Sequence, residues 1–378
     1  MRYFLIAGEA SGDLHGGQLI DALRRVDADA QFEFLGGDCM ERAAGTKPLI
    51  HYRDMAFMGF IEVLKHLRSI LGFMSRAKAA MSARRPDALI LIDYPSFNLK
   101  VAKWAHGEGI PVFYFISPKV WAWKQWRVKD IKRYVSHVFS ILPFEVEWYR
   151  RHSYEVTYVG NPTVAEVAQA QTTFSPRERF LIEHNLSPTL PLIAIVPGSR
   201  HKEIRDNLPE MIAAAKRHPD CQIAIAAAPA VDREVYRRVM GNSDIALIEG
   251  KTMELVSNAQ VAIVTSGTAT LETAVIGTPQ VACYRMNGSK WVYRFYSKLI
   301  HGKYVTLPNL IADAPVIPEL LLHLCNADTI DAHLSRLLPT DSPERGKMLD
   351  GYRTMMSKLG NDDCAINTAR AIAEALNP

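Results

Sequence analysis

The sequence predicts an α/β protein of two domains, each built around a parallel β-sheet. The chain has 378 residues, and one hydrophobic core rarely serves so long a chain. Short β-branched or aromatic runs alternate with stretches of helical periodicity, such as residues 18–26 and 208–217. This alternation is typical of βαβ units around a parallel sheet. The predicted strands are residues 3–7, 32–35, 88–92, 112–115, 137–141, 192–196, 222–226, 245–248, 261–264 and 280–283.

A stretch containing several prolines marks the expected domain boundary. Residues 172–190 interrupt the βα alternation, which restarts in the following strand. We therefore expect an N-terminal Rossmann-like domain over residues 1–170 and a second one over residues 171–343. Residues 344–378 have a helical pattern after a proline-containing break, and they can pack back on the first domain. Two such domains that face each other form a cleft at the carboxyl ends of their strands, where ligands of open α/β sheets bind.

The composition is that of an ordinary globular protein and excludes several classes. Apolar residues make up 48 % and charged residues 22 % of the chain. The net charge is 44 − 40 = +4, too small to indicate a nucleic-acid partner. The five cysteines are scattered and form no CxxC pair, so we predict reduced thiols and no zinc site. No stretch has the length of a transmembrane helix or the form of a signal peptide, which predicts a cytoplasmic protein.

The first predicted strand continues into GEASGDLHGG, residues 8–17. Its glycines permit tight turns and close approach of a ligand. The run is neither GxGxxG nor a Walker A loop, and Glu9 and Asp13 would repel a phosphate. Together with Ser11, these carboxylates favour a polar acceptor such as a sugar. A purely structural role for the loop is the alternative.

Asp93 follows the buried run ALILI and precedes a proline turn in DYPSFN. A carboxylate at a strand end can face the cleft and serve as a general base. The alternative is that Asp93 caps the next helix, a common role for aspartate. The residues by themselves favour the cap.

Two further strand ends carry anion-binding patterns. The run PGSRHKEI (197–204) places cations at a helix start, where they are unfavourable unless an anion lies there. We expect Ser199 to cap this helix and Arg200 to contact a diphosphate; a solvated basic turn is the alternative. The run SGTATLE (266–272) forms another helix start, and its Glu272 either grips a ribose diol or lies exposed on the helix surface. No histidine or carboxylate spacing indicates a metal site.

Several of these runs together resemble the lipid-A-disaccharide synthase family. They occur in the family's order between residues 7 and 311, which makes a chance match improbable. The matching runs are AGEASGD (7–13), MGFIEVL (58–64), IDYPSFN (92–98), FISPKVWAW (115–123), ILPFE (141–145), VGNP (159–162), PGSR (197–200), SGTATLE (266–272), YRM (284–286) and YVTLPNLI (304–311).

The resemblance implies an inverting glycosyltransferase of the GT-B fold that needs no cofactor and no bound metal. The implied donor is UDP-2,3-diacylglucosamine, and the acceptor is 2,3-diacylglucosamine 1-phosphate (lipid X). The products are then the β-1,6-linked lipid A disaccharide 1-phosphate and UDP. The implied catalytic residues are Asp93, as base or as a group that orients the acceptor hydroxyl, and Arg200. The other implied site residues are Gly198, Ser199, Ser266, Gly267, Thr268, Glu272 and Asn309 for the donor, and Glu9, Ser11, Asp13 and Asn98 for the acceptor.

Three positions depart from the family pattern. Ser96 stands where the family commonly has aspartate, Leu322 replaces a glutamine, and Asn161 stands in a run that often reads VGHP. Two other functions stay open at this point. One is a UDP-sugar 2-epimerase of the same architecture, and the other is a non-catalytic, membrane-bound nucleotide-binding protein.

Acylated substrates predict a peripheral contact with the cytoplasmic face of the inner membrane. Residues 63–85 carry six basic residues and no acidic residue, and apolar side chains including Phe57, Phe60, Phe73 and Met74 lie in or just before this stretch. Such a pattern is typical of an interfacial helix, although the apolar stripe can also be core. Residues 290–304 are similarly basic and aromatic. The chain can also form a homodimer.

Overall fold

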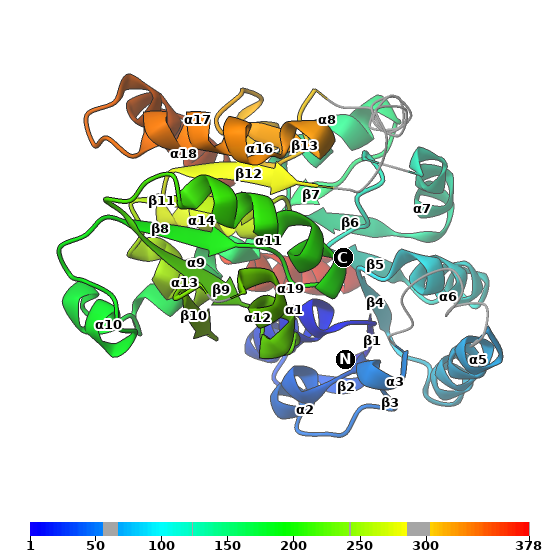
Figure 1. The fold of residues 1–378 in the computed structure, drawn as a ribbon. Coiled ribbons are helices and arrows are strands. Elements are labelled where there is room, and N and C mark those ends of the chain that lie inside the picture. Colours follow the sequence, from blue (N-terminus) through cyan, green and yellow to red (C-terminus); the bar gives the residue numbers. More distant parts are fainter. Residues whose placement is uncertain (56–66, 123, 242, 286–302, 378) are drawn as a thin grey trace. The chain divides into compact units, whose positions relative to one another are not determined.

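A computed structural model describes residues 1–55, 67–122, 124–241, 243–285 and 303–377 (Figure 1). Contacts divide the chain into two compact units. Unit 1 comprises Met1–Pro162 with Asn361–Pro378, and unit 2 comprises Thr163–Gly360. The first division falls at the start of a helix, eight residues before the predicted limit at residue 170. Of the two C-terminal helices, only the last belongs to unit 1.

Unit 1 holds a seven-stranded, wholly parallel sheet with the order β3-β2-β1-β4-β5-β6-β7. Its strands are β1 Arg2–Ala7, β2 Gln31–Gly36, β3 Ile50–His51, β4 Ala88–Ile92, β5 Val112–Phe115, β6 His137–Ser140 and β7 Thr157–Tyr158. Its helices are α1 Ala10–Val26, α2 Asp38–Ala44, α3 Tyr52–Met55, α5 Leu67–Arg84, α6 Pro95–Gly107, α7 Val128–Tyr134, α8 Pro143–Arg151 and α19 Cys364–Leu376, with a 3₁₀ turn at Gln125–Arg127.

Unit 2 holds a six-stranded parallel sheet with the order β10-β9-β8-β11-β12-β13. Its strands are β8 Leu192–Val196, β9 Gln222–Ala227, β10 Ala246–Glu249, β11 Val261–Thr265, β12 Gln280–Tyr284 and β13 Glu319–Leu321. Its helices are α9 Pro162–Gln171, α10 Arg177–Glu183, α11 His201–Ala215, α12 Arg233–Met240, α13 Thr252–Ser257, α14 Thr268–Ile276, α16 Leu307–Ala312, α17 Ala327–Leu337 and α18 Pro343–Leu359, with a 3₁₀ turn at Leu322–Leu324.

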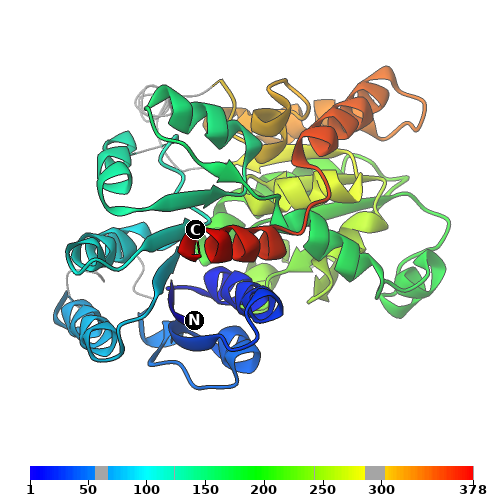
Figure 2. The same ribbon diagram turned by 180° about the vertical axis from the view of Figure 1, so that it is seen from behind.

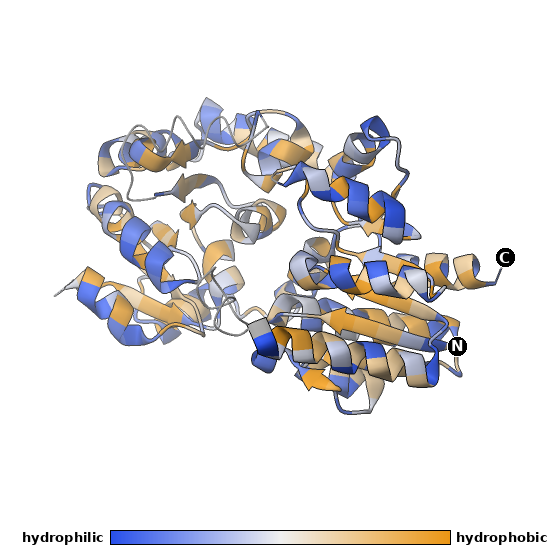
Figure 3. Cartoon of the chain, turned by 90° about the vertical axis from the view of Figure 1, so that its right-hand side faces the viewer, coloured by the Kyte–Doolittle hydropathy of each residue, from blue (hydrophilic) through white to orange (hydrophobic). Residues whose placement is uncertain are grey.

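The strands are apolar on both faces because helices cover both sides of each sheet. In β1, Phe4 and Ile6 belong to one core cluster, and Tyr3 and Leu5 belong to the cluster on the opposite face. Figure 3 shows the strands as the most hydrophobic parts of the ribbon. The prediction of two Rossmann-like domains is confirmed by these two parallel sheets.

The last helix returns to the first sheet. In Figure 2, α19 (red) lies along α1 (blue). Its Ala369 and Ile372 are fully buried in the same cluster as Leu19 and Leu23 of α1. The Asn367 side chain also donates to the Val159 carbonyl at 3.2 Å. Unit 1 therefore needs a segment that follows the whole of unit 2 in the chain.

The strand orders fix where ligands can bind. In both sheets the order reverses direction beside the first strand, between β1 and β4 and between β8 and β11. Open α/β sheets bind ligands outside the carboxyl ends of the strands at this reversal. The segments that leave these four strands carry Glu9, Asp93, Arg200 and Gly267, so these four predicted site residues lie at the reversals. Within the described ranges, no helix is long and apolar enough to cross a membrane.

Candidate active site

Unit 2 has a pocket of about 480 Å³ at the carboxyl ends of β8 and β11. Seven of the eight predicted donor residues line it. They are Gly198, Ser199, Arg200, Ser266, Gly267, Thr268 and Glu272. The pocket also contains Glu203, Thr252, Ala228 and Pro229, which sequence reasoning missed.

The start of α11 is closed by a carboxylate of its own. Arg200, and not the predicted Ser199, is the residue that precedes the helix, and no side chain caps it. Instead, Glu203 reaches back and accepts the Ser199 N–H at 3.1 Å, and it also pairs with Arg200 at 3.5 Å. Gly198 has a φ of +111°, and a Cβ there would lie 2.6 Å from the Glu203 carboxylate. This glycine therefore lets Glu203 fold over the turn. A glutamate at the third position of a helix is the sequence signal that could have predicted this contact.

The start of α14 is open by comparison. Gly267 precedes the helix, and no side-chain cap bond is present. A Cβ at Gly267 would meet nothing within 4 Å. Thr270 turns its hydroxyl inward to the Gly267 carbonyl at 2.7 Å. The first N–H groups of α14 thus face a pocket with room for an anion, which the positive end of the helix favours.

Glu272 lies half-buried one turn into α14 and lines the same pocket. Burial, followed by the nearby charge of Glu166, raises its pKa. Glu272 is thus half-buried and lines the pocket, so the alternative of an exposed surface glutamate is wrong. A carboxylate in this position can accept hydrogen bonds from a diol.

Asn309 lies outside the residues that line this pocket. It is buried, and its side chain is used within unit 2. Its Oδ1 accepts the Val316 and Ile317 N–H groups at 2.8 Å each, and its Nδ2 donates to the Ile317 carbonyl and to Glu319 at 3.0 Å. These contacts give Asn309 a structural role in fixing residues 316–317.

In unit 1, Asp93 and Glu9 meet at the carboxyl ends of β4 and β1. Burial, then the charge of Glu9 and a hydrogen bond with it, raise the pKa of Asp93 to about 6. Lys119 and a backbone hydrogen bond oppose the shift. The two carboxyl groups repel each other when both are charged, and this repulsion favours the protonated form of Asp93. Asp93 does not cap the next helix, since Tyr94 precedes α6 and no side-chain cap bond is present.

The backbone that presents Asp93 is strained. Asp93 and Tyr94 have φ values of 43° and 46°, in the left-handed region that non-glycine residues rarely adopt. The Asp93 carbonyl accepts the Tyr114 hydroxyl at 2.5 Å and Asn98 Nδ2 at 2.7 Å. Gly8 makes room for the Tyr94 ring, because a Cβ there would lie 2.3 Å from the ring. Such strain costs about 1–3 kcal/mol per residue and clusters at functional sites.

The predicted acceptor residues divide into two groups. Glu9 reaches Asp93, and Ser11 donates to Glu9 at 3.4 Å. Asp13 is buried and accepts the N–H groups of Gly37, Cys39 and Met40 at 2.6, 2.9 and 3.1 Å. It therefore secures the start of α2, and Asn98 secures the Asp93 turn.

The glycine-rich run is not a loop, contrary to the sequence expectation. Helix α1 begins at Ala10, so Gly12, Gly16 and Gly17 lie inside it. A Cβ at Gly16 would lie 2.6 Å from Met40 Sδ, and one at Gly17 would lie 3.0 Å from the Cys39 carbonyl oxygen. These glycines let α1 approach α2 closely.

Glu145 is a buried acid near the carboxyl ends of the unit 1 strands, and the sequence did not single it out. Glu145 accepts Trp121 Nε1 at 2.9 Å and a short hydrogen bond from the Ser140 hydroxyl. Burial raises its pKa to about 7, although both hydrogen bonds and Lys119 oppose the shift. Trp121 also packs edge-on against Phe144, with ring centroids 5.0 Å apart. Glu145 thus holds the loop that follows β5, next to the Asp93 turn.

The two sites offer complementary chemistry. Unit 1 supplies a carboxyl pair that can take up a proton, and unit 2 supplies an open helix start, a cation and a carboxylate around one pocket. In the part of the chain that the structure describes, no group of three or more metal-ligating side chains is present. The runs at residues 58–64 and 284–286 lie wholly or partly outside the described residues, as does most of residues 290–304.

Comparison with known families gives a single answer across the chain. Residues 3–373 match the family described as "Lipid-A-disaccharide synthetase". The "Lipid-A-disaccharide synthase" of Myxococcus xanthus is 38 % identical and aligns over 100 % of this chain and 98 % of its own length. That of Syntrophus aciditrophicus is 37 % identical over 94 % of this chain and 93 % of its own length.

Solved structures share the fold at much lower identity. The UDP-GlcNAc 2-epimerase from Neisseria meningitidis, bound to UDP-GlcNAc, superposes with a TM-score of 0.65 at 13 % identity, covering 100 % of both chains. The putative UDP-N-acetylglucosamine 2-epimerase from Listeria monocytogenes gives a TM-score of 0.67 at 13 % identity, covering 100 % of this chain and 96 % of its own. At this identity the likeness shows a common architecture only.

Proposed function

The chain belongs to the lipid-A-disaccharide synthetase family, and from that premise we propose how its residues transfer the sugar. Family membership makes it a glycosyltransferase that forms the lipid A disaccharide from a UDP-sugar. We propose UDP-2,3-diacylglucosamine as the donor and 2,3-diacylglucosamine 1-phosphate as the acceptor. The products are the β-1,6-linked disaccharide 1-phosphate and UDP.

Asp93 is proposed to take the proton of the acceptor 6-hydroxyl. As the hydroxyl oxygen forms its bond to the anomeric carbon, the bond from that carbon to the UDP oxygen breaks. A base with a pKa near the working pH is suited to this step, and the pKa of about 6 for Asp93 supports the role. Glu9 is proposed to tune Asp93 and to bind the acceptor.

The leaving UDP is proposed to lie in the pocket of unit 2. Its diphosphate meets the open start of α14, and Arg200 supplies the opposing positive charge. Preorganised donors that face developing charge usually give the largest catalytic contribution. Glu272 is proposed to hold the ribose diol. The observation that carries the assignment is the convergence of seven predicted donor residues on one pocket.

The direct test is an assay with the donor, with and without the acceptor. Disaccharide and UDP should appear in equal amounts, and only when both substrates are present. Conversion of UDP-GlcNAc to its 2-epimer, without any acceptor, would instead support the epimerase function. Binding of UDP with neither reaction would support a non-catalytic role.

We also propose that the enzyme meets its acylated substrates at an anionic membrane surface on its cytoplasmic side. Leu71 on α5 is 51 % exposed, and exposed Arg68 and Arg76 lie near it in the sequence. Basic residues at such a surface attract anionic lipids. Met74 is buried and Phe73 packs on the core, while Phe57 and Phe60 lie outside the described residues.

Liposome sedimentation tests the membrane contact. The variant Leu71→Ser with Arg68→Gln should bind anionic vesicles more weakly, whereas Leu190→Ser, at an exposed leucine of unit 2, should bind as the wild type does. Equal binding by all three proteins would place any membrane contact elsewhere.

A further inference from the structure

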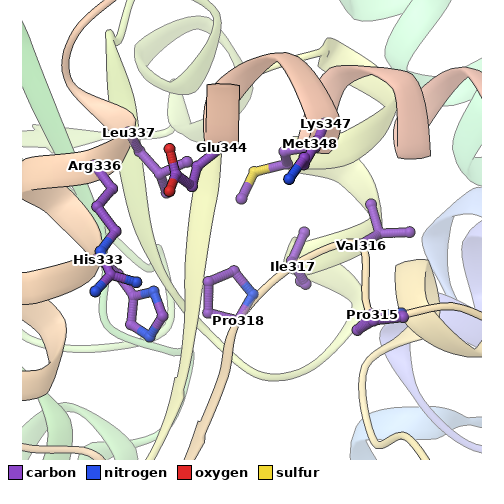
Figure 4. Close-up of a pocket in the computed structure, with 10 residues that line it drawn as sticks. All are labelled: Pro315, Val316, Ile317, Pro318, His333, Arg336, Leu337, Glu344, Lys347 and Met348. Atoms are coloured by element: carbon purple, nitrogen blue, oxygen red, sulfur yellow. The ribbon is translucent and has the colours of Figure 1, made fainter. Parts of the chain in front are cut away.

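A second pocket in unit 2 lies away from the donor pocket. It has a volume of about 300 Å³ and is formed by residues 315–318 with parts of α17 and α18 (Figure 4). Residues 315–318 precede β13, and Met348 Sδ accepts the N–H of Gln280, the first residue of β12. The pocket therefore lies toward the amino ends of these strands. The donor pocket follows the carboxyl ends of β8 and β11, and the two pockets share no lining residue.

The inner wall of this pocket is apolar and firmly held. Val316, Ile317, Leu337 and Met348 line it and are otherwise buried. The backbone at residues 316–317 is fixed by three hydrogen bonds to the side chain of the buried Asn309, at 2.8, 2.8 and 3.0 Å. A preformed apolar surface of this kind binds a ligand without first being ordered.

The polar side chains of the pocket are not engaged by the protein. His333 and Arg336 come from α17, and Glu344 and Lys347 come from α18 (Figure 4). Within the described part of the chain, no hydrogen bond or ion pair involves the side chain of any of these four residues. Nearby Arg217 differs, because it pairs with Asp328 and Asp331.

The charges of the pocket select one kind of ligand. Arg336 and Lys347 contribute two positive charges, and Glu344 contributes one negative charge. Burial, followed by the charge of Arg336, lowers the pKa of His333 and so favours its neutral imidazole, which can donate or accept a hydrogen bond. The net charge of +1 suits a single negative charge better than a phosphate dianion.

We propose that this pocket binds a small organic monoanion with an apolar body, such as an aromatic carboxylate. The apolar body lies on Ile317 and Met348, and the carboxylate lies beside Arg336 and His333, while Lys347 adds positive charge from the other side of the pocket (Figure 4). Ordinary ligand efficiency for a molecule of this size gives a Kd on the order of 1 mM. The site is independent of the assignment of the donor pocket.

Methyl NMR of protein labelled at isoleucine and methionine methyl groups tests the site directly. Titration with 2-naphthoate should shift the Ile317 and Met348 methyl resonances. The neutral 2-naphthalenemethanol and the small anion acetate should each bind at least about tenfold more weakly, because each lacks one of the two interactions. Saturating UDP should leave the naphthoate titration unchanged.

A double variant with a matched control separates the charge contribution. Arg336→Gln with Lys347→Gln should weaken naphthoate binding by about tenfold or more. Arg353→Gln removes an exposed cation from the same helix, α18, and should leave the Kd unchanged. All three substitutions are at exposed positions, and equal thermal midpoints confirm that the variants fold. The proposal fails if neither methyl shifts at ~10 mM naphthoate, if the neutral alcohol binds equally well, or if UDP displaces the ligand.

Discussion

The carboxyl edges of the two sheets have the same topology but opposite electrostatic character. In unit 1, burial raises the pKa of both Asp93 and Glu145, and the charge of Glu9 adds to the shift of Asp93. In unit 2, the same edge is an open pocket with a free helix start and a largely exposed Arg200. One Rossmann-like architecture thus carries a buried carboxyl group at this edge in unit 1 and an open pocket beside a helix start in unit 2, because the residues after each strand differ.

Asp93→Asn removes the carboxylate proposed as the base in unit 1, and it should reduce turnover more than any other variant described below. Loss of a general base costs about 10²–10⁴ in turnover. Asp21→Asn, on the exposed side of α1, is the control and should retain full activity. Nearly normal turnover in a folded Asp93→Asn protein would assign Asp93 to a structural role.

The pH profile sharpens the same assignment. A base must be deprotonated, so activity should rise with pH through about 6, the pKa of Asp93. Glu9→Gln removes a charge that raises this pKa, and the acidic limb should therefore move to lower pH. An unmoved limb would show that Glu9 does not couple to the titrating group.

Arg200→Ala tests the proposed contact of Arg200 with the diphosphate in the pocket of unit 2. Removal of one such donor costs about 10²–10³ in turnover. Arg205→Ala changes an exposed arginine of the same helix that pairs with Asp206, and it should leave turnover nearly unchanged. If the two variants behave alike, Arg200 does not contact the leaving group.

Glu145→Gln tests whether burial raises the pKa of the Glu145 carboxyl group. The folded-state pKa of about 7 lies above the usual 4.5, so the stability that protonation provides is present below pH 4.5 and lost as pH rises through about 7. The loss is at most about 3 kcal/mol. Thermal midpoints of the wild type should fall over this window more than those of the variant, and parallel curves would contradict the shift.

Glu272→Gln should give the smallest effect. Loss of one charged hydrogen bond to the ribose should weaken UDP binding by roughly tenfold. Calorimetry of the variant and of Glu178→Gln, an exposed glutamate on α10, makes the comparison. An unchanged affinity in Glu272→Gln would remove the ribose assignment.

The sequence predicted the ten longer strands because each is a mainly apolar run next to segments of helical periodicity. It missed β3, β7 and β13, which have two, two and three residues. Such short edge strands have no periodicity of their own, and the neighbouring strand determines them. The start of α1 was also missed, since its glycines indicate a turn locally but serve helix packing in the fold.

The site could be predicted where residues act through their position in the chain. Gly198, Arg200 and Gly267 follow strands directly, so topology alone brings them to one pocket. Asn309 and Asp13 could not be assigned this way, because their partners at residues 316–317 and 37–40 become neighbours only in three dimensions. For the same reason, the hydrogen bond from Trp121 to Glu145 has no local signature.

The position of α19 has a consequence for folding during synthesis. Residues 361–377 leave the ribosome after all of unit 2, yet they cover α1 in unit 1. Unit 1 is therefore translated first but completed last. The apolar surface of α1 that α19 covers stays exposed while unit 2 is synthesised. A nascent chain at that stage exposes the kind of surface that chaperones bind and that aggregation begins from. Unit 1 is thus the first unit to be started in translation, but its core is completed only by the last helix.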